Sequence, residues 1–204
     1  MDGNITALVA GLSSHSPEIM NATGRPDDSR KSQINTMLHL AFHDLRALAA
    51  GSIYAFSGKR RPSWLPKTEQ LLEGFMQKNH LGQTATVASD SLPAMIEITA
   101  ACDHAQKKIQ VGRFLVGLIL PASHRKLVNP RVEFMKELGP FFLEKKVSTP
   151  GQYYMFFSSR QVLSLRLEQT RKLKATSRLR NQALADLQAW FAYQASRQGT
   201  MMLK

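Results

Sequence analysis

The chain has 204 residues, of which 43% are hydrophobic and 21% are charged, and its formal net charge is +12. This length and apolar content suit a globular protein with one domain in two parts or with two small domains. The single cysteine, Cys102, excludes an intrachain disulfide and the class of disulfide-stapled secreted domains. The N-terminus lacks a basic segment followed by an apolar core, so we expect no signal peptide.

The excess positive charge lies in the second half of the chain. Residues 1–102 contain 9 Lys or Arg and 9 Asp or Glu, whereas residues 103–204 contain 18 and 6. This segregation favours an anionic partner, either nucleic acid or an acidic membrane surface. The longest apolar run, 114–122, is about half of the ~18 residues that span a bilayer. Any membrane contact is therefore expected to be peripheral.

Along the chain, apolar residues recur mainly at three- and four-residue spacings, which predicts helices. Segment 111–120 is ambiguous, because its β-branched residues favour a strand whereas the helical setting favours a buried helix. We expect a helix there. The other expected helices cover approximately 2–12, 29–56, 66–80, 91–108 and 129–146, with a polar connection at 82–91.

The last long segment, 158–198, contains no proline and precedes Gly199, which predicts one helix. On a helical projection, apolar residues such as Val162 and Leu165 share one face. Seven basic residues against one acid fall between Arg160 and Arg180. A solvated basic face is the ordinary interpretation of such a run. The functional interpretation is a cationic ridge, formed by Arg160, Arg171, Lys174 and Arg178, that meets phosphates.

These elements predict an all-α fold, a multi-helix bundle in two sub-domains with a long basic amphipathic C-terminal helix. We expect an N-terminal helical domain at 1–146 with a division near 82–91. A linker at 147–157 and a basic C-terminal helical region at 158–204 follow.

Motifs for catalysis and cofactor binding are missing from the sequence. There is no phosphate-binding glycine loop, no H-E-x-x-H and no C-x-x-C. His39 and His43 have the i, i+4 spacing of a metal pair, but zinc needs three or four converging ligands. We therefore expect no enzyme activity, no catalytic residue, no metal, no cofactor and no small-molecule substrate.

The remaining functional candidates are clusters of basic residues, one of which has Arg113 beside it. Trp64, Tyr153 and Tyr154 are the nearby aromatic residues that could stack on bases. The candidate residues for anionic lipid or nucleic-acid binding are Lys59, Arg60, Arg61, Lys107, Lys108, Arg125, Lys126, Arg131, Lys145, Lys146, Arg160, Arg171, Lys172, Lys174, Arg178 and Arg180.

The segment Asp44–Leu72, DLRALAAGSIYAFSGKRRPSWLPKTEQLL, resembles part of an orthomyxovirus (influenza-type) matrix protein. That family has a small-residue apolar helix, a turn, a basic run and another helix at about this place. The segment 112–138 and the ending LADLQAWFAYQASRQGTMMLK are also similar. The resemblance covers under half of the chain, which is shorter than the influenza members and lacks their cysteine-histidine cluster. By position, Lys59, Arg60 and Arg61 match the family's basic run.

The resemblance implies an all-helical protein that self-associates under a viral envelope and touches anionic lipid and ribonucleoprotein. The expected function is a viral structural matrix protein that self-assembles into homo-oligomers and binds anionic phospholipid membrane through a cationic surface. The alternative is an RNA-binding nucleocapsid or coat protein with sequence-independent phosphate contacts. The expected location is the virion beneath the envelope, the host cytoplasm, the inner face of the plasma membrane and the nucleus.

Overall fold

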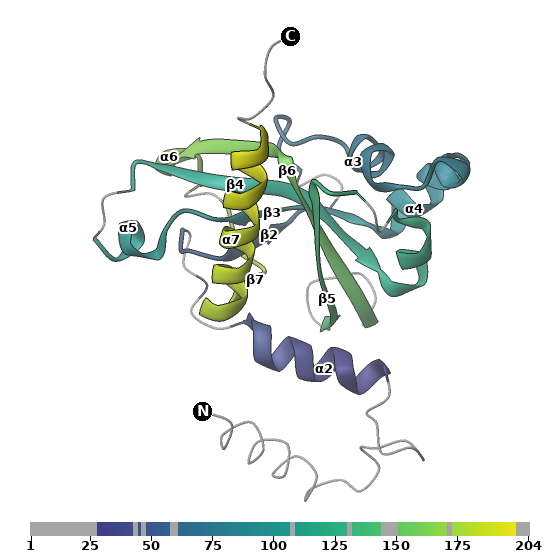
Figure 1. The fold of residues 1–204 in the computed structure, drawn as a ribbon, viewed down its shortest axis with the longest axis horizontal. Coiled ribbons are helices and arrows are strands. Elements are labelled where there is room, and N and C mark those ends of the chain that lie inside the picture. Colours follow the sequence, from purple (N-terminus) through teal and green to yellow (C-terminus); the bar gives the residue numbers. More distant parts are fainter. Residues whose placement is uncertain are drawn as a thin grey trace, which may run out of the picture.

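The computed structural model describes residues 28–42, 45, 48–57, 61–106, 109–129, 132–143, 151–170 and 173–198. The strands in these residues form one curled antiparallel sheet with helices on both faces (Figure 1). Across the sheet the order is β1-β7-β2-β3-β4-β6-β5. The strands are β1 (Leu40–Ala41), β2 (Ser52–Ala55), β3 (Leu92–Glu97), β4 (Val111–Pro121), β5 (Met135–Leu143), β6 (Gly151–Arg166) and β7 (Ser177–Leu179).

The helices are short apart from the first and the last. The α-helices are α2 (Asp28–His39), α3 (Thr68–Phe75), α4 (Thr84–Asp90), α5 (Ala101–Ala105), α6 (Leu167–Thr170) and α7 (Asn181–Gln198), and the 3-10 helices are η3 (Lys78–Gln83) and η4 (Ala122–Leu127).

The prediction of an all-α bundle is wrong, because the described residues contain a sheet of seven antiparallel strands. The same finding contradicts the all-helical fold that the matrix-protein resemblance implies. Segments expected to be helices form strands instead. Residues 91–108 contain β3, residues 129–146 contain β5, and the ambiguous segment 111–120 is strand β4.

The expected single helix over 158–198 is also wrong. Its residues form the second half of β6, the one-turn helix α6, strand β7 and then α7. The helical projection placed Val162 and Leu165 on one face. In a strand, residues of opposite parity point to opposite faces. Val162 is accordingly 41% exposed, whereas Leu165 is buried.

Three predicted helices have counterparts in the structure. Helix α2 forms the first part of the expected 29–56, and the rest of that segment contains β1 and β2 instead of helix. Helix α3 lies within the expected 66–80 and buries Leu71, Leu72 and Phe75. Helix α7 forms the last part of the expected 158–198 and buries Leu184 and Leu187. Helices α3 and α7 carry apolar residues at three- and four-residue spacings, and this apolar face packs against the sheet.

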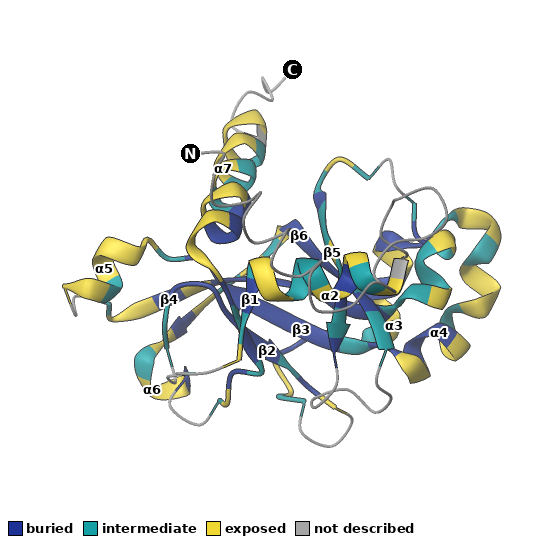
Figure 2. Ribbon diagram, turned by 90° about the horizontal axis from the view of Figure 1, so that it is seen from below, coloured by how far each residue is buried: buried dark blue, intermediate teal, exposed yellow. Residues whose placement is uncertain are grey.

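The sheet is covered on both faces, so the protein has two apolar clusters. One cluster joins α3 and α4 to side chains such as Tyr54, Phe114 and Phe156. The other joins α7 to side chains that include Ile96 and Leu115. Figure 2 shows the buried strands between helices whose outer surfaces are exposed. Burial on both faces explains the nearly continuous apolar run of β4, which lacks the alternation expected of a half-buried strand.

Close contact between β4 and β6 requires a glycine. A Cβ atom added to Gly117 would lie 1.8 Å from the backbone oxygen of Phe156. No side chain fits at such a distance, so Gly117 permits the two longest strands to cross closely.

The expected linker at 147–157 overlaps the first part of β6, which pairs with β5 from Gly151 and also with β4 from Tyr153. Tyr153, Met155, Phe156 and Phe157 in this part are buried. Strands β6 and β7 from the expected C-terminal region belong to the same sheet as β2 and β3.

Candidate ligand-binding cleft

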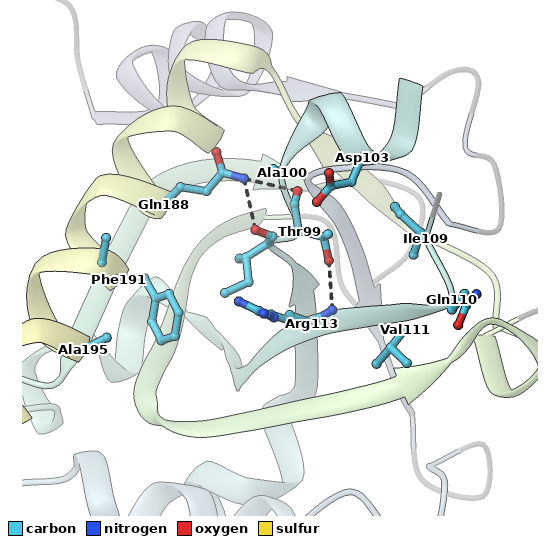
Figure 3. Close-up of a pocket in the computed structure, with 12 residues that line it drawn as sticks. Thr99, Ala100, Asp103, Ile109, Gln110, Val111, Arg113, Gln188, Phe191 and Ala195 are labelled. Carbon is cyan, nitrogen blue, oxygen red and sulfur yellow. Dashed lines mark hydrogen bonds between the residues drawn. The ribbon is translucent and has the colours of Figure 1, made fainter. Parts of the chain in front are cut away.

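A cleft of about 880 Å³ opens between α7 and the ends of β3 and β4. Figure 3 shows that its walls come from four segments of the chain. These are the turn after β3, helix α5, the start of β4 and the second half of α7. The lining residues are Ile98, Thr99, Ala100, Asp103, Ile109, Gln110, Val111, Arg113, Gln188, Phe191, Ala192 and Ala195.

Strand alternation directs Arg113 into this cleft. Gly112 and Phe114 are buried, whereas Val111 and Arg113 are exposed and line the cleft with Phe191 of α7. The backbone of Arg113 is held by two hydrogen bonds. Its N–H donates to Thr99 Oγ1 at 3.0 Å, and its carbonyl oxygen accepts from the N–H of Ile98 at 2.8 Å. The base of the Arg113 side chain is therefore fixed by the end of β3.

Gln188 fastens α7 to the same part of the sheet. Its Nε2 donates to the carbonyl oxygens of Ile98 at 3.0 Å and Thr99 at 3.3 Å (Figure 3). Without these contacts the two carbonyl groups at the end of β3 would depend on water. The opposite walls of the cleft are thus joined by hydrogen bonds, and the cleft is preformed.

The guanidinium of Arg113 has no hydrogen bond or ion pair within the described part of the chain. Figure 3 shows its side chain extending toward Phe191. Asp103, from α5, lies on another wall. An arginine offers up to five donors in a planar fork, which suits a phosphate or a carboxylate. The cleft therefore contains a cation available to an anionic ligand.

A smaller hollow of about 340 Å³ continues from the cleft. The two share Ile109, Gln110 and Val111 in their walls, and the smaller one adds Arg166 and Glu168. Arg166 is the register partner of Val111 across β4 and β6. The combined surface therefore presents two guanidinium groups along one end of the sheet, with two carboxylates beside them.

A hydrogen bond between His104 and the buried carboxyl of Glu97 holds α5 against this end of the sheet. His104 Nε2 lies 2.9 Å from Oε2 of Glu97, whose side chain is completely buried. The N–H of Thr99 donates to Glu97 Oε1 at 2.9 Å. Burial raises the pKa of the Glu97 carboxyl above its ordinary value of 4.5, although the hydrogen bonds from Thr99 and the nearby His104 oppose that shift. The pair positions the neighbouring Asp103 at the cleft wall.

Tyr54 lies near this pair, and burial raises the pKa of its phenol to about 12, with a smaller contribution from the charge of Glu97. Its ring meets Phe114 edge to face, with centroids 5.9 Å apart. Tyr54 belongs to the apolar cluster on the α3 side of the sheet. It therefore supports the cleft floor from behind and does not line the cleft.

Four of the sequence-predicted arginines donate side-chain hydrogen bonds within the described part of the protein. Arg125 Nε donates to Glu137 Oε1 at 2.8 Å, and its guanidinium also lies over the rings of Tyr154 and Phe156. The other three donate to backbone oxygens: Arg61 to Leu65 and Pro62, Arg178 to Ala50, and Arg180 to Leu40. These guanidinium groups have a structural role.

The described residues of the predicted cationic ridge, Arg160, Lys174 and Arg178, do not lie on one helix. Arg160 lies in β6 and Arg178 in β7, and the sheet order places β4, β3 and β2 between these strands. Arg160 lies over the ring of Phe134, at 4.1 Å from its centroid, and Lys126 and Lys174 are exposed on other elements. Outside the described residues lie Lys59, Arg60, Lys107, Lys108, Arg131, Lys145, Lys146, Arg171 and Lys172.

Sequence reasoning noted Arg113 beside Lys107 and Lys108 without giving it a role, and it missed Gln188 and Phe191. A signal available in the sequence was the polar residues, Gln110 and Arg113, just before the apolar run of β4. That signal marks a strand entering the core at this point. The pairing of this point with α7 depends on contacts between distant residues, which one sequence does not reveal.

The comparisons with known proteins find no match among protein-family models, curated proteins or solved structures. In the described part of the chain, no helix is long and apolar enough to cross a membrane. In that same part, no group of three or more His, Cys, Asp or Glu side chains is arranged to hold a metal ion.

Proposed function

We propose that this protein binds single-stranded RNA, with little dependence on base sequence, in the cleft between α7 and the ends of β3 and β4. The observation that carries the proposal is the guanidinium of Arg113, which has no protein partner in the described residues and extends toward Phe191 in an open cleft. A cation beside an aromatic ring is the combination that contacts a phosphate and stacks on a base.

The dimensions and charge of the surface support a short stretch of nucleic acid. A cleft of about 880 Å³ accommodates a drug-sized group, and the adjoining hollow with Arg166 offers a second phosphate contact. Asp103 and Glu168 do not attract phosphates. They are suited to accept hydrogen bonds from base amino groups, as acidic side chains do at nucleic-acid sites.

The net charge of +12 adds a long-range attraction to a polyanion. All of the excess lies after residue 102, in the part of the chain that includes Arg113 and Arg166. Releasing counterions from RNA makes such binding strongly dependent on salt.

Membrane binding, the function expected first from the sequence, is the competing candidate. It required a flat cationic surface, and the predicted ridge residues Arg160 and Arg178 lie on strands that are not adjacent. The cleft with Arg113 is concave, which suits a chain-like ligand better than a bilayer surface. The test must therefore distinguish binding to RNA from binding to a membrane.

The test measures the affinity for a fluorescein-labelled mixed-sequence RNA of about 12 nucleotides by anisotropy over a salt series. Arg113→Glu is expected to weaken binding about tenfold or more at moderate salt. The matched control is Lys126→Glu, which makes the same charge change at an exposed site on η4. We expect Lys126→Glu to change the affinity less than about twofold, apart from the shared long-range effect.

Equal losses in the two variants would show that only net charge matters and would contradict the cleft as the site. Vesicles with and without phosphatidylserine, tested by flotation with the same variants, separate the two partners. Salt-sensitive flotation together with no measurable RNA affinity would replace the RNA proposal by the membrane alternative.

A further inference from the structure

The second half of β6 is an open edge of the sheet. Strand β5 pairs with β6 only from Gly151 to Ser158. Beyond Ser159, whose N–H donates to the carbonyl oxygen of Phe134 at 2.9 Å, β6 continues to Arg166, and β4 is its only partner strand among the described residues. In Figure 1 this part of β6 runs along the border of the sheet toward α6.

The hydrogen-bond pattern identifies the residues whose backbone groups point outward. The N–H of Leu167 donates to the carbonyl oxygen of Gln110 at 3.1 Å. Because antiparallel pairing alternates, Leu165 and Leu163 also direct their backbone groups toward β4. Val162 and Ser164 therefore direct an N–H and a C=O each away from β4. The next outward N–H, that of Arg166, donates to Gln169 Oε1 at 2.9 Å and ends the open segment.

The side chains of the open segment are suited to receive a strand. Val162 is β-branched and 41% exposed, and Ser164 is also exposed. Arg160 and Arg166 flank these residues, and both are exposed. Open edges bind extended peptides by main-chain hydrogen bonds, and the flanking side chains determine which peptides bind.

We propose that the segment Val162–Ser164 binds an extended acidic segment of a partner protein as an additional antiparallel strand. Charge selects this partner over a second copy of the chain. Two copies paired about Leu163 would place Arg160 of each opposite Arg166 of the other, and like charges directly opposite are destabilising. A strand with carboxylates at both ends and apolar residues in the middle complements the same two arginines.

The direct test uses a peptide of eight residues, capped at both ends, with Val and Thr in the middle and two Glu at each end. Amide hydrogen exchange of the wild-type protein is followed by NMR with the peptide at about 1 mM, a concentration that detects weak binding. The peptide is expected to slow exchange at Val162 and Ser164. A peptide with Lys in place of Glu is expected to leave their exchange unchanged.

The matched variants are Ser164→Pro and Ser164→Ala. Proline removes the outward N–H without removing a bond to β4, whereas alanine keeps that N–H. We expect Ser164→Pro to weaken binding of a fluorescent acidic peptide about tenfold and Ser164→Ala to change it less than about twofold. RNA affinity is expected to be the same in both variants, so this inference and the RNA proposal fail independently.

Unchanged exchange at Val162 and Ser164 in the wild-type protein with saturating acidic peptide would overturn the proposal, whatever the variants do. Equal peptide affinity of the two variants would also overturn it. A concentration-dependent dimer that Ser164→Pro abolishes would overturn it in favour of pairing between two copies of this chain.

Discussion

Strands β5 and β6 each present an edge of the same sheet, but the described residues cover only one of these edges. Helix α2 lies against β5, and its polar side chains take the place of a neighbouring strand. Asn35 Nδ2 donates to the carbonyl oxygen of Pro140 at 3.2 Å. The hydroxyl of Thr36 accepts from the N–H of Phe142 at 2.7 Å. No equivalent contact reaches Val162 or Ser164 in the described residues.

The comparison shows two solutions to one physical problem. An edge strand of a sheet presents unpaired backbone N–H and C=O groups, to which another strand can bind. At β5 the side chains of α2 satisfy these groups within the protein. At the end of β6 the edge is short, twisted by the irregular pairing near Leu115, and flanked by arginines, so it rejects copies of itself and remains open to an acidic strand.

The largest effect tests the direction of the backbone groups in the open edge. Leu163→Pro removes an N–H that faces β4 and should destabilise the fold by about 3 kcal/mol. Ser164→Pro, one residue later, should cost less than about 1 kcal/mol, because its N–H faces outward. Urea unfolding followed by circular dichroism measures both. Equal losses would mean that the outward and inward residues are assigned incorrectly.

An intermediate effect tests the covered edge. Thr36→Val keeps the shape of the side chain but leaves the N–H of Phe142 without its acceptor. We expect a loss of about 1–2 kcal/mol in the free energy of unfolding. Thr36→Ser keeps the hydroxyl and is the control, with most of the stability retained. If Thr36→Val unfolds at the wild-type urea concentration, α2 does not stabilise the β5 edge through this contact.

The smallest of the three expected effects concerns Glu97, at the end of the sheet where the cleft begins. Because its pKa is raised in the folded protein, Glu97 contributes stability that is fully present below its ordinary pKa of 4.5 and is lost as the pH rises through the raised value. Glu97→Gln removes this dependence and keeps an acceptor for Thr99. The variant should therefore gain stability relative to the wild type as the pH rises above about 4.5.

Thermal unfolding of both proteins across that pH range measures the difference. A difference that stays constant with pH would mean that the carboxyl of Glu97 titrates alike in the folded and unfolded chains. His104→Gln, which removes the imidazole but keeps Glu97, is a control for the contribution of the contact between His104 and Glu97.

Only some elements could be predicted from the sequence. Helix α3 and helix α7 have an apolar face at helical spacing and lie within predicted helices. Strand β4 could not be predicted in this way, because it is buried on both faces and has no alternation to distinguish it from a buried helix. In β6, apolar residues happened to fit a helical face. The pairing of Leu163 with Phe114 and of Leu165 with Gly112 decides that this segment is a strand.

The residues that form the candidate cleft could not be predicted from the sequence. The excess of positive charge in the second half of the chain is visible in the sequence, but its distribution over the surface is not. Arg125 became part of an ion pair with Glu137, and Arg178 became a donor to the backbone of Ala50. Arg113 has no such partner in the described residues, and it lies near the start of β4 in the cleft beside α7.

By itself the sequence determined the net charge of +12, the absence of an intrachain disulfide and the amphipathic faces of α3 and α7, because these depend on residue identity and near neighbours. Tertiary structure alone decided that Arg113 meets Phe191 in a cleft and that β6 extends past β5. These features arise from strand pairing between distant segments, in which register and burial outweigh local propensity.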